Sequence, residues 1–126
     1  MSQIQQVRKG STPLLILSVL VEGEKYGYQI MHELERRSEG YFTMTAALLY
    51  PALHQLEANG LVTSERRVNP GERRRRYYTI TPRGREALVE NLVEWKTFLN
   101  NLFKTLQSPS TGASEQFVPT DSCINN

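Results

Sequence analysis

An unbroken run of arginines gives this sequence its clearest chemical signal. The run consists of Arg73, Arg74, Arg75 and Arg76 and follows an Asn-Pro-Gly-Glu segment. Adjacent like charges repel one another unless water or a polyanion surrounds them, and a guanidinium can bind phosphate oxygens or enter a narrow minor groove. The run therefore predicts either contact with nucleic acid or a solvated turn. The same two alternatives apply to Arg66 and Arg67, which precede it.

Positive charge is concentrated around this run. Residues 66–85 carry eight arginines and one acidic residue, although the whole chain of 126 residues has a formal net charge of only +2. Such a local excess is expected of a surface that binds a polyanion, rather than of general solubility.

A short helix predicted just before the arginines has the dimensions to enter a nucleic-acid groove. Thr45 is a typical N-cap, apolar residues recur at helical spacing at Leu49, Leu53 and Leu56, and Gly60 is a typical C-terminal stop. The opposite face carries small, aromatic and hydrogen-bonding side chains, namely Ala46, Ala47, Tyr50 and His54. We predict a recognition helix. The alternatives are that Tyr50 packs on the preceding helix and that His54 is an ordinary surface residue.

Two further tyrosines, Tyr26 and Tyr28, flank Gly27 at the predicted start of that preceding helix. Free backbone N–H groups and the helix dipole favour a phosphate at such a position. The alternative is packing of the rings in the core, which we expect for one of the two.

The most regular pattern lies in the last predicted helix, residues 83–106. Apolar residues recur at alternating intervals of four and three, at Leu88, Leu92, Trp95, Leu99, Leu102 and Leu106. This spacing is typical of a coiled-coil seam, which one helix cannot bury alone, so we predict dimerisation with the same helix of a second subunit. Trp95 either fills that interface or holds the helices apart and leaves an apolar slot for a flat aromatic ligand.

Together these segments predict a mostly α fold with a small β-hairpin, that is, a winged helix-turn-helix followed by a long C-terminal dimerisation helix. We expect a flexible arm or short helix at residues 1–11, the DNA-binding domain at 12–82, the dimerisation helix at 83–106 and a disordered tail at 107–126. Within the domain, Thr12 and Pro13 are the expected N-cap and first residue of a helix that ends near Glu22, and strands are expected at residues 61–68 and 75–81.

Other classes of function fit the sequence poorly. His32 and His54 lie on different predicted helices with no nucleophile motif, metal-ligand spacing or glycine-rich phosphate loop nearby, so we expect no enzyme activity, metal or cofactor. Cys123 is the only cysteine, which excludes an internal disulfide. The longest apolar run, residues 13–21, is too short to span a membrane and no signal peptide is apparent, so we expect a cytoplasmic protein without membrane contact.

Three motifs, in order, resemble the PadR family of bacterial transcriptional regulators. The first is Tyr-Gly-Tyr-Gln-Ile at residues 26–30. The second is Leu-Tyr-Pro-Ala-Leu at residues 49–53, followed by Leu-Glu at 56–57 and Gly-Leu at 60–61. The third is Arg-Tyr-Tyr at residues 76–78, followed by Thr81 and Gly84. The resemblance covers residues 12–105.

The resemblance implies a homodimeric repressor that binds an inverted-repeat operator in double-stranded DNA. The recognition helix would lie in the major groove and the wing on the backbone or in the minor groove. Tyr26, Tyr28 and Tyr50 would contact DNA. It also implies that a small hydrophobic or phenolic effector could release the DNA by acting through the dimerisation helix.

One departure from the family pattern bears on the DNA contacts. The family often has a Gly-Thr step before Leu-Tyr-Pro, where this chain has Ala47 and Leu48, so a hydroxyl contact would fall to Thr43 or Thr45. The main alternative function is a winged-helix protein-interaction adaptor in signalling or clock control, whose arginines bind acidic protein. A third alternative is a ligand carrier that uses the Trp95 slot.

Overall fold

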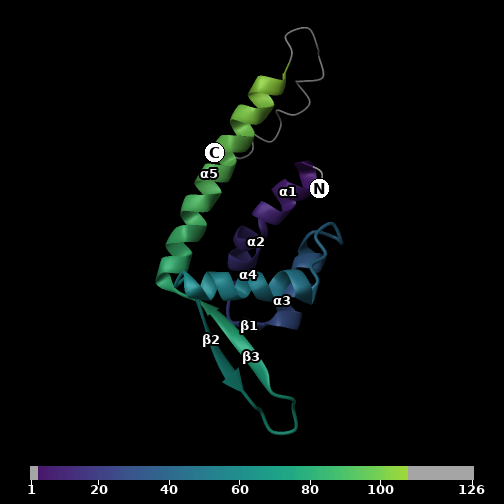
Figure 1. Ribbon diagram of the computed structural model, residues 1–126, viewed down its shortest axis with the longest axis vertical. Coiled ribbons are helices and arrows are strands. Elements are labelled where there is room, and N and C mark those ends of the chain that lie inside the picture. Colours follow the sequence, from purple (N-terminus) through teal and green to yellow (C-terminus); the bar gives the residue numbers. More distant parts are fainter. Residues whose placement is uncertain (1–2, 108–126) are drawn as a thin grey trace. The chain divides into compact units, whose positions relative to one another are not determined.

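The chain folds into five helices and three short strands, as Figure 1 shows. The computed structural model describes residues 3–107, and the chain divides into two units, Met1–Leu92 and Val93–Asn126. The helices are α1 (Gln3–Gly10), α2 (Thr12–Leu20), α3 (Gly27–Arg37), α4 (Ala46–Ala58) and α5 (Pro82–Leu106). The strands are β1 (Lys25–Tyr26), β2 (Val62–Arg67) and β3 (Arg75–Ile80). The predicted mostly α fold with a wing and a long C-terminal helix is confirmed.

Of the two alternatives predicted for the N-terminal segment, a flexible arm or a short helix, the structure has the helix α1. α1 and α2 meet at Ser11, which has helical backbone angles and is the N-cap of α2. Its N–H donates to the carbonyl oxygens of Val7 and Arg8, so the helical hydrogen bonding continues almost without a break. The prediction that Thr12 is the N-cap was therefore wrong by one residue, because Thr12 lies inside the helix and is buried.

α3 and α4 end with the same hydrogen-bond pattern, in which an N–H beyond the helix reaches back over the last turn. At the end of α3, Gly40 donates to the carbonyl of Glu35, and Glu39 has a φ of 53°. At the end of α4, Leu61 donates to the carbonyl of Leu56, and Gly60 has a φ of 78°. The predicted stop at Gly60 is confirmed, since glycine adopts a positive φ without strain.

The sheet has three antiparallel strands in the order β1-β3-β2, rather than the two of the predicted hairpin. β2 and β3 form the wing, which projects away from α2, α3 and α4 at the lower end of Figure 1. β1 precedes α3 and pairs Tyr26 with Tyr77 on the other edge of β3. The sequence did not predict β1 because two residues are too few to show the alternation typical of a strand.

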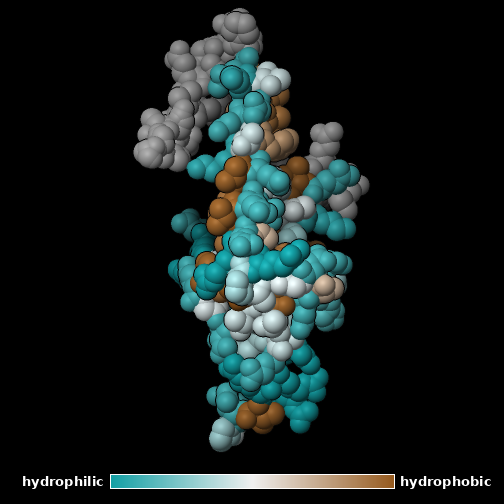
Figure 2. Space-filling model, turned by 90° about the vertical axis from the view of Figure 1, so that its left-hand side faces the viewer, coloured by the Kyte–Doolittle hydropathy of each residue, from teal (hydrophilic) through white to brown (hydrophobic). Residues whose placement is uncertain are grey.

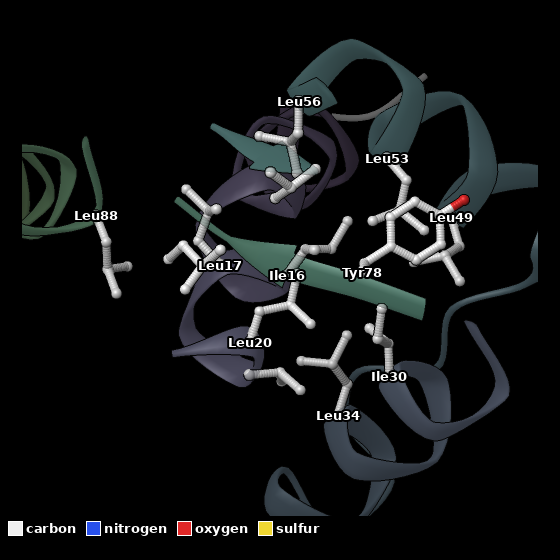
Figure 3. Close-up of a cluster of buried hydrophobic side chains, with 13 residues drawn as sticks. Ile16, Leu17, Leu20, Ile30, Leu34, Leu49, Leu53, Leu56, Tyr78 and Leu88 are labelled. Carbon is white, nitrogen blue, oxygen red and sulfur yellow. The ribbon is translucent and has the colours of Figure 1, made fainter. Parts of the chain in front are cut away.

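The core fills the space between α2, α3, α4 and the sheet. Its side chains come from every one of these elements, as Figure 3 shows, and include Ile16, Leu17, Leu20, Ile30, Leu34, Leu49, Leu53, Leu56 and Tyr78. α2 contributes the most because it is apolar on nearly all sides, which agrees with the prediction that it is central. α4 is thereby held by one face only, and its other face stays at the surface.

The start of α5 belongs to the first unit. The Thr81 hydroxyl accepts a hydrogen bond from the Gly84 N–H at 2.9 Å and donates one to the Gly60 carbonyl at 2.8 Å. Leu88 is 7% exposed and lies in the core of this unit (Figure 3). Its place in the dimer seam stays a prediction, and the chain's own core already covers most of this side chain.

The second unit contains the C-terminal part of α5, which ends at Leu106. The predicted disordered tail of residues 107–126 lies outside the described residues except for Gln107, and so does Cys123. Among the described residues, no helix is long and apolar enough to cross a membrane.

Candidate nucleic-acid interface

The exposed face of α4 carries the residues that the sequence assigned to DNA. Leu49, Leu53 and Leu56 are buried, as their spacing predicts. The side chains on the opposite side are all exposed, and we call them, with the two threonines before them, the recognition face: Thr43, Thr45, Ala46, Ala47, Tyr50 and His54. The small side chains of Ala46 and Ala47 would let a DNA backbone approach the start of α4 closely. The hydroxyl and imidazole groups of the face can form hydrogen bonds.

Tyr50 is both packed and accessible. Its phenol lies against Gly27 at the start of α3, so that a Cβ atom added to Gly27 would be 2.2 Å from the Tyr50 Oη atom. The side chain nevertheless remains 37% exposed. The two alternatives considered for Tyr50 are therefore compatible, because contact with α3 fixes the ring while leaving part of it free.

The two tyrosines of the α3 start have different environments. Tyr28 is 64% exposed and stacks on His32, with a distance of 6.0 Å between the ring centroids. Tyr26 is half-buried and meets the Tyr77 ring edge to face at 5.4 Å. As expected, one of the two packs, and Tyr28 is the more exposed to solvent.

The register of the wing divides its arginines between two faces of the sheet. We call the side that carries Val62, Ser64, Tyr78 and Ile80 the core face, because it continues into the buried core, and the opposite side the outer face. Antiparallel partners share a face, so Arg66 and Arg76 lie together on the core face, and Arg67 and Arg75 lie together on the outer face. Arg73 and Arg74 lie in the turn between the strands and are exposed.

The arginines of the core face and the turn are the most available to a polyanion. Arg66, Arg73 and Arg74 have no hydrogen-bond or ion-pair partner among residues 3–107. Arg76 donates to the Ser64 hydroxyl at 3.0 Å, and Ser64 donates to the Glu57 carboxylate of α4 at 2.9 Å. This chain of hydrogen bonds connects the wing to α4. Sequence reasoning missed it because nothing in the spacing of Glu57 and Ser64 marks a contact.

The arginines of the outer face are already occupied within the chain. Arg67 binds both carboxylate oxygens of Glu24, at 2.5 and 2.8 Å, and its guanidinium lies 4.6 Å from the centre of the Tyr77 ring. These hydrogen bonds hold the pKa of Glu24 below its ordinary value. Arg75 lies 4.3 Å from the Tyr26 ring centre and forms an ion pair with Glu72.

α5 exposes apolar side chains along its length beyond Leu88. Leu92 is 45% exposed, Leu99 38% and Leu106 67%, while Leu102 and Trp95 are half-buried. Trp95 meets the Phe98 ring edge to face at 6.1 Å. Figure 2 shows hydrophobic side chains beside hydrophilic ones along the C-terminal half of α5. Because exposed apolar surface of this kind marks interaction sites, the helix offers a face to a partner.

The described part of the chain offers no metal centre. Within residues 3–107, no three His, Cys, Asp or Glu side chains are grouped so that they could hold an ion. The polar groups of the recognition face and the wing can donate hydrogen bonds and carry positive charge, which are the properties that a nucleic acid backbone requires.

Comparison with known proteins gives the same family as the motifs. Residues 16–90 match the model of the transcriptional regulator PadR-like family. A transcriptional regulator of Mycobacterium tuberculosis is 39% identical over 88 residues, which are 70% of this chain and 78% of that protein.

Two solved structures are also similar. A transcriptional regulator from Clostridium thermocellum aligns with a TM-score of 0.75 at 30% identity, over 85% of this chain and 99% of that one. A PadR family regulator from Eggerthella lenta aligns with a TM-score of 0.75 at 30% identity, over 83% and 89% of the two chains. Members of the family regulate transcription and are not enzymes, as predicted. The chain therefore belongs to the PadR-like family of DNA-binding transcriptional regulators.

Proposed function

We propose that the protein is a homodimeric repressor that binds an inverted-repeat operator. The observation that supports this most directly is the combination of two features: an exposed recognition face on α4, and wing arginines that have no partner within residues 3–107. The recognition face enters the major groove, and the wing arginines bind phosphates or the minor groove on either side.

The two parts of the surface have different tasks. Arg66, Arg73 and Arg74 bind the backbone and supply affinity that depends on salt but little on sequence. Tyr50 and His54 contact base edges or fix the helix on neighbouring phosphates, and Thr43 or Thr45 supplies the hydroxyl contact. Sequence preference therefore comes from α4, and most of the salt-dependent affinity comes from the wing.

The exposed apolar side chains of α5 support a homodimer. Leu92, Leu99 and Leu106 recur every seven residues, and the same three side chains on a second copy would cover them. A two-fold axis through this contact repeats the DNA-binding surface, and two copies related in this way fit an inverted repeat. Substituting Leu99 by aspartate should give a monomer in light scattering while circular dichroism shows an unchanged fold.

Repression follows if the operator overlaps a promoter, because a bound dimer would exclude the polymerase. A small hydrophobic or phenolic effector bound at Trp95 would change the spacing of the two recognition faces and release the DNA. Deleting the gene and measuring transcription of the neighbouring genes tests the sign of regulation, and an increase is expected.

A DNA-binding titration tests the central proposal. We expect tight binding to a discrete palindrome upstream of the gene, weaker binding at high salt, and loss of affinity in the Arg73→Gln/Arg74→Gln variant. The control, Lys96→Gln/Lys104→Gln, removes the same number of positive charges from α5 and should bind DNA as the parent does. If every fragment binds weakly and both variants equal the parent, the repressor proposal is wrong and the protein-interaction adaptor replaces it.

A further inference from the structure

A cavity of about 540 Å³ lies between the N-terminal helices and the segment that leads into α4. α1 contributes Arg8 and Lys9 to it, and α2 contributes Thr12 and Leu15. Its other wall consists of the segment before α4, including Phe42 and Met44, and the exposed Leu48 of α4 itself. A cavity of this volume is in the range that accommodates a small organic ligand.

The lining combines an apolar surface with positive charge. Phe42, Met44, Leu15 and Leu48 present apolar side chains, whereas Arg8 and Lys9 are cationic, and no acidic residue lines the cavity. An apolar wall favours an aromatic or alkyl body, and the two cations favour a carboxylate or sulfonate at its end. We propose that this cavity binds an amphipathic organic anion, with Arg8 and Lys9 holding the charged group.

Arg8 connects the cavity to the segment that positions α4. Its Nη2 atom donates to the carbonyl of Tyr41 at 3.0 Å, and its guanidinium lies 4.8 Å from the centre of the Tyr41 ring. From the other side, the Phe42 N–H donates to the Ser38 hydroxyl at 2.8 Å. A bound anion competes with the Tyr41 carbonyl for Arg8 and so loosens one of these two attachments.

The ligand therefore acts on the recognition face directly. Thr43 both lines the cavity and belongs to the recognition face, and Leu48 lies within the first turn of α4. Anion binding shifts the start of α4 and adds negative charge beside the DNA phosphates, so it weakens DNA binding. Since coupling is reciprocal, DNA also weakens anion binding. This coupling rests on the proposed function, whereas the binding site itself does not.

The test uses the full chain and the fluorescent anion 8-anilinonaphthalene-1-sulfonate, without DNA. We expect saturable binding of one probe per chain. The Arg8→Gln/Lys9→Gln variant should raise the dissociation constant about tenfold, because charge-assisted contacts are lost at a partly open site. The Lys96→Gln/Lys104→Gln control should bind as the parent does. Binding at this cavity should remain in a Trp95→Ala variant, which removes the separate effector slot proposed on α5. The neutral probe N-phenyl-1-naphthylamine should bind the charge variant and the parent equally.

Three results would overturn the proposal. The first is that anion binding survives in Arg8→Gln/Lys9→Gln, and the second is that Trp95→Ala abolishes it. The third is binding only to the monomeric Leu99→Asp variant, which would mean that a second copy covers the cavity. A separate titration then measures the DNA affinity at saturating probe, which should fall for the parent and stay constant for Arg8→Gln/Lys9→Gln. If the protein does not bind DNA at all, the probe titration still decides the cavity proposal.

Discussion

Replacing Arg67 by glutamine should leave the salt dependence of DNA binding unchanged, although Arg67 belongs to the basic wing. Its guanidinium is held by both oxygens of Glu24 and lies over the Tyr77 ring on the outer face of the sheet. Arg66, one residue earlier, has no partner within residues 3–107 and lies on the core face. The two arginines are therefore a matched pair, of which only Arg66 is expected to bind phosphate.

The size of the difference follows from counterion release. Each phosphate contact contributes about 0.9 to the slope of log affinity against log salt. Losing Arg66 from both subunits of a dimer should lower the magnitude of this slope by about 1.8. When salt rises fourfold, the Arg66→Gln variant should therefore lose about 12-fold less affinity than the parent loses. Fluorescence anisotropy with a labelled operator between about 50 and 200 mM salt measures both slopes. Arg67→Gln should lower affinity at every salt concentration without changing the slope, because it only loosens the wing.

The Glu24→Gln variant distinguishes two possible roles of Arg67, positioning the wing and binding phosphate, because the two roles change the DNA affinity in opposite directions. If Arg67 positions the wing, removing its carboxylate partner weakens DNA binding, and the double variant with Arg67→Gln is no weaker than either single variant. If Arg67 instead binds phosphate, Glu24→Gln leaves its guanidinium with only the longer 3.4 Å ion pair to Glu65 and strengthens DNA binding. Tighter binding by Glu24→Gln, together with a lower slope for Arg67→Gln, would refute the assignment.

Three further predictions concern packing and protonation. Gly27→Ala places a Cβ atom 2.2 Å from the Tyr50 hydroxyl oxygen and must displace that phenol, so the fold should persist while operator affinity falls about tenfold for a dimer; affinity equal to the parent would contradict the placement of Tyr50. Gly84→Ala places a Cβ atom 2.1 Å from the Leu61 carbonyl oxygen and should lower the unfolding free energy by about 1–3 kcal/mol in denaturant titrations; an unchanged midpoint would show that the backbone can move apart there. The pKa of Glu33 is lowered from 4.5 to about 2 by hydrogen bonds from two arginines, so its stabilising effect is present above pH 4.5 and is lost as pH falls to about 2. The difference in denaturant midpoint between the parent and Glu33→Gln should shrink as pH falls over that range. A difference that stays constant would exclude this carboxylate as its source.

The recognition face was predictable because its signals are local. An N-cap at Thr45, leucines at helical spacing and a glycine stop define α4, and the structure places these residues as expected. The face opposite the leucines then follows from helix geometry alone.

The division of the wing arginines was not predictable, because it depends on strand register and on Glu24, which is distant in sequence. Periodicity also could not show where α5 leaves the core. Leu88 continues the seam by spacing, yet it is buried within its own chain, whereas Leu92 is exposed. A repeat of apolar residues indicates a face that must be covered, but not which surface covers it.

The central position of β3 in the sheet has a consequence for how the domain folds. The pairing of β3 with β2 joins segments that are adjacent in sequence, so the wing can form early. The pairing of β3 with β1 brings Tyr26 to Tyr77 across about fifty residues, and closing such a loop requires the intervening helices to be in place. Completion of the sheet should therefore be a late step in folding. Pairing of β1 with β3 would then indicate that the helices between them have already packed.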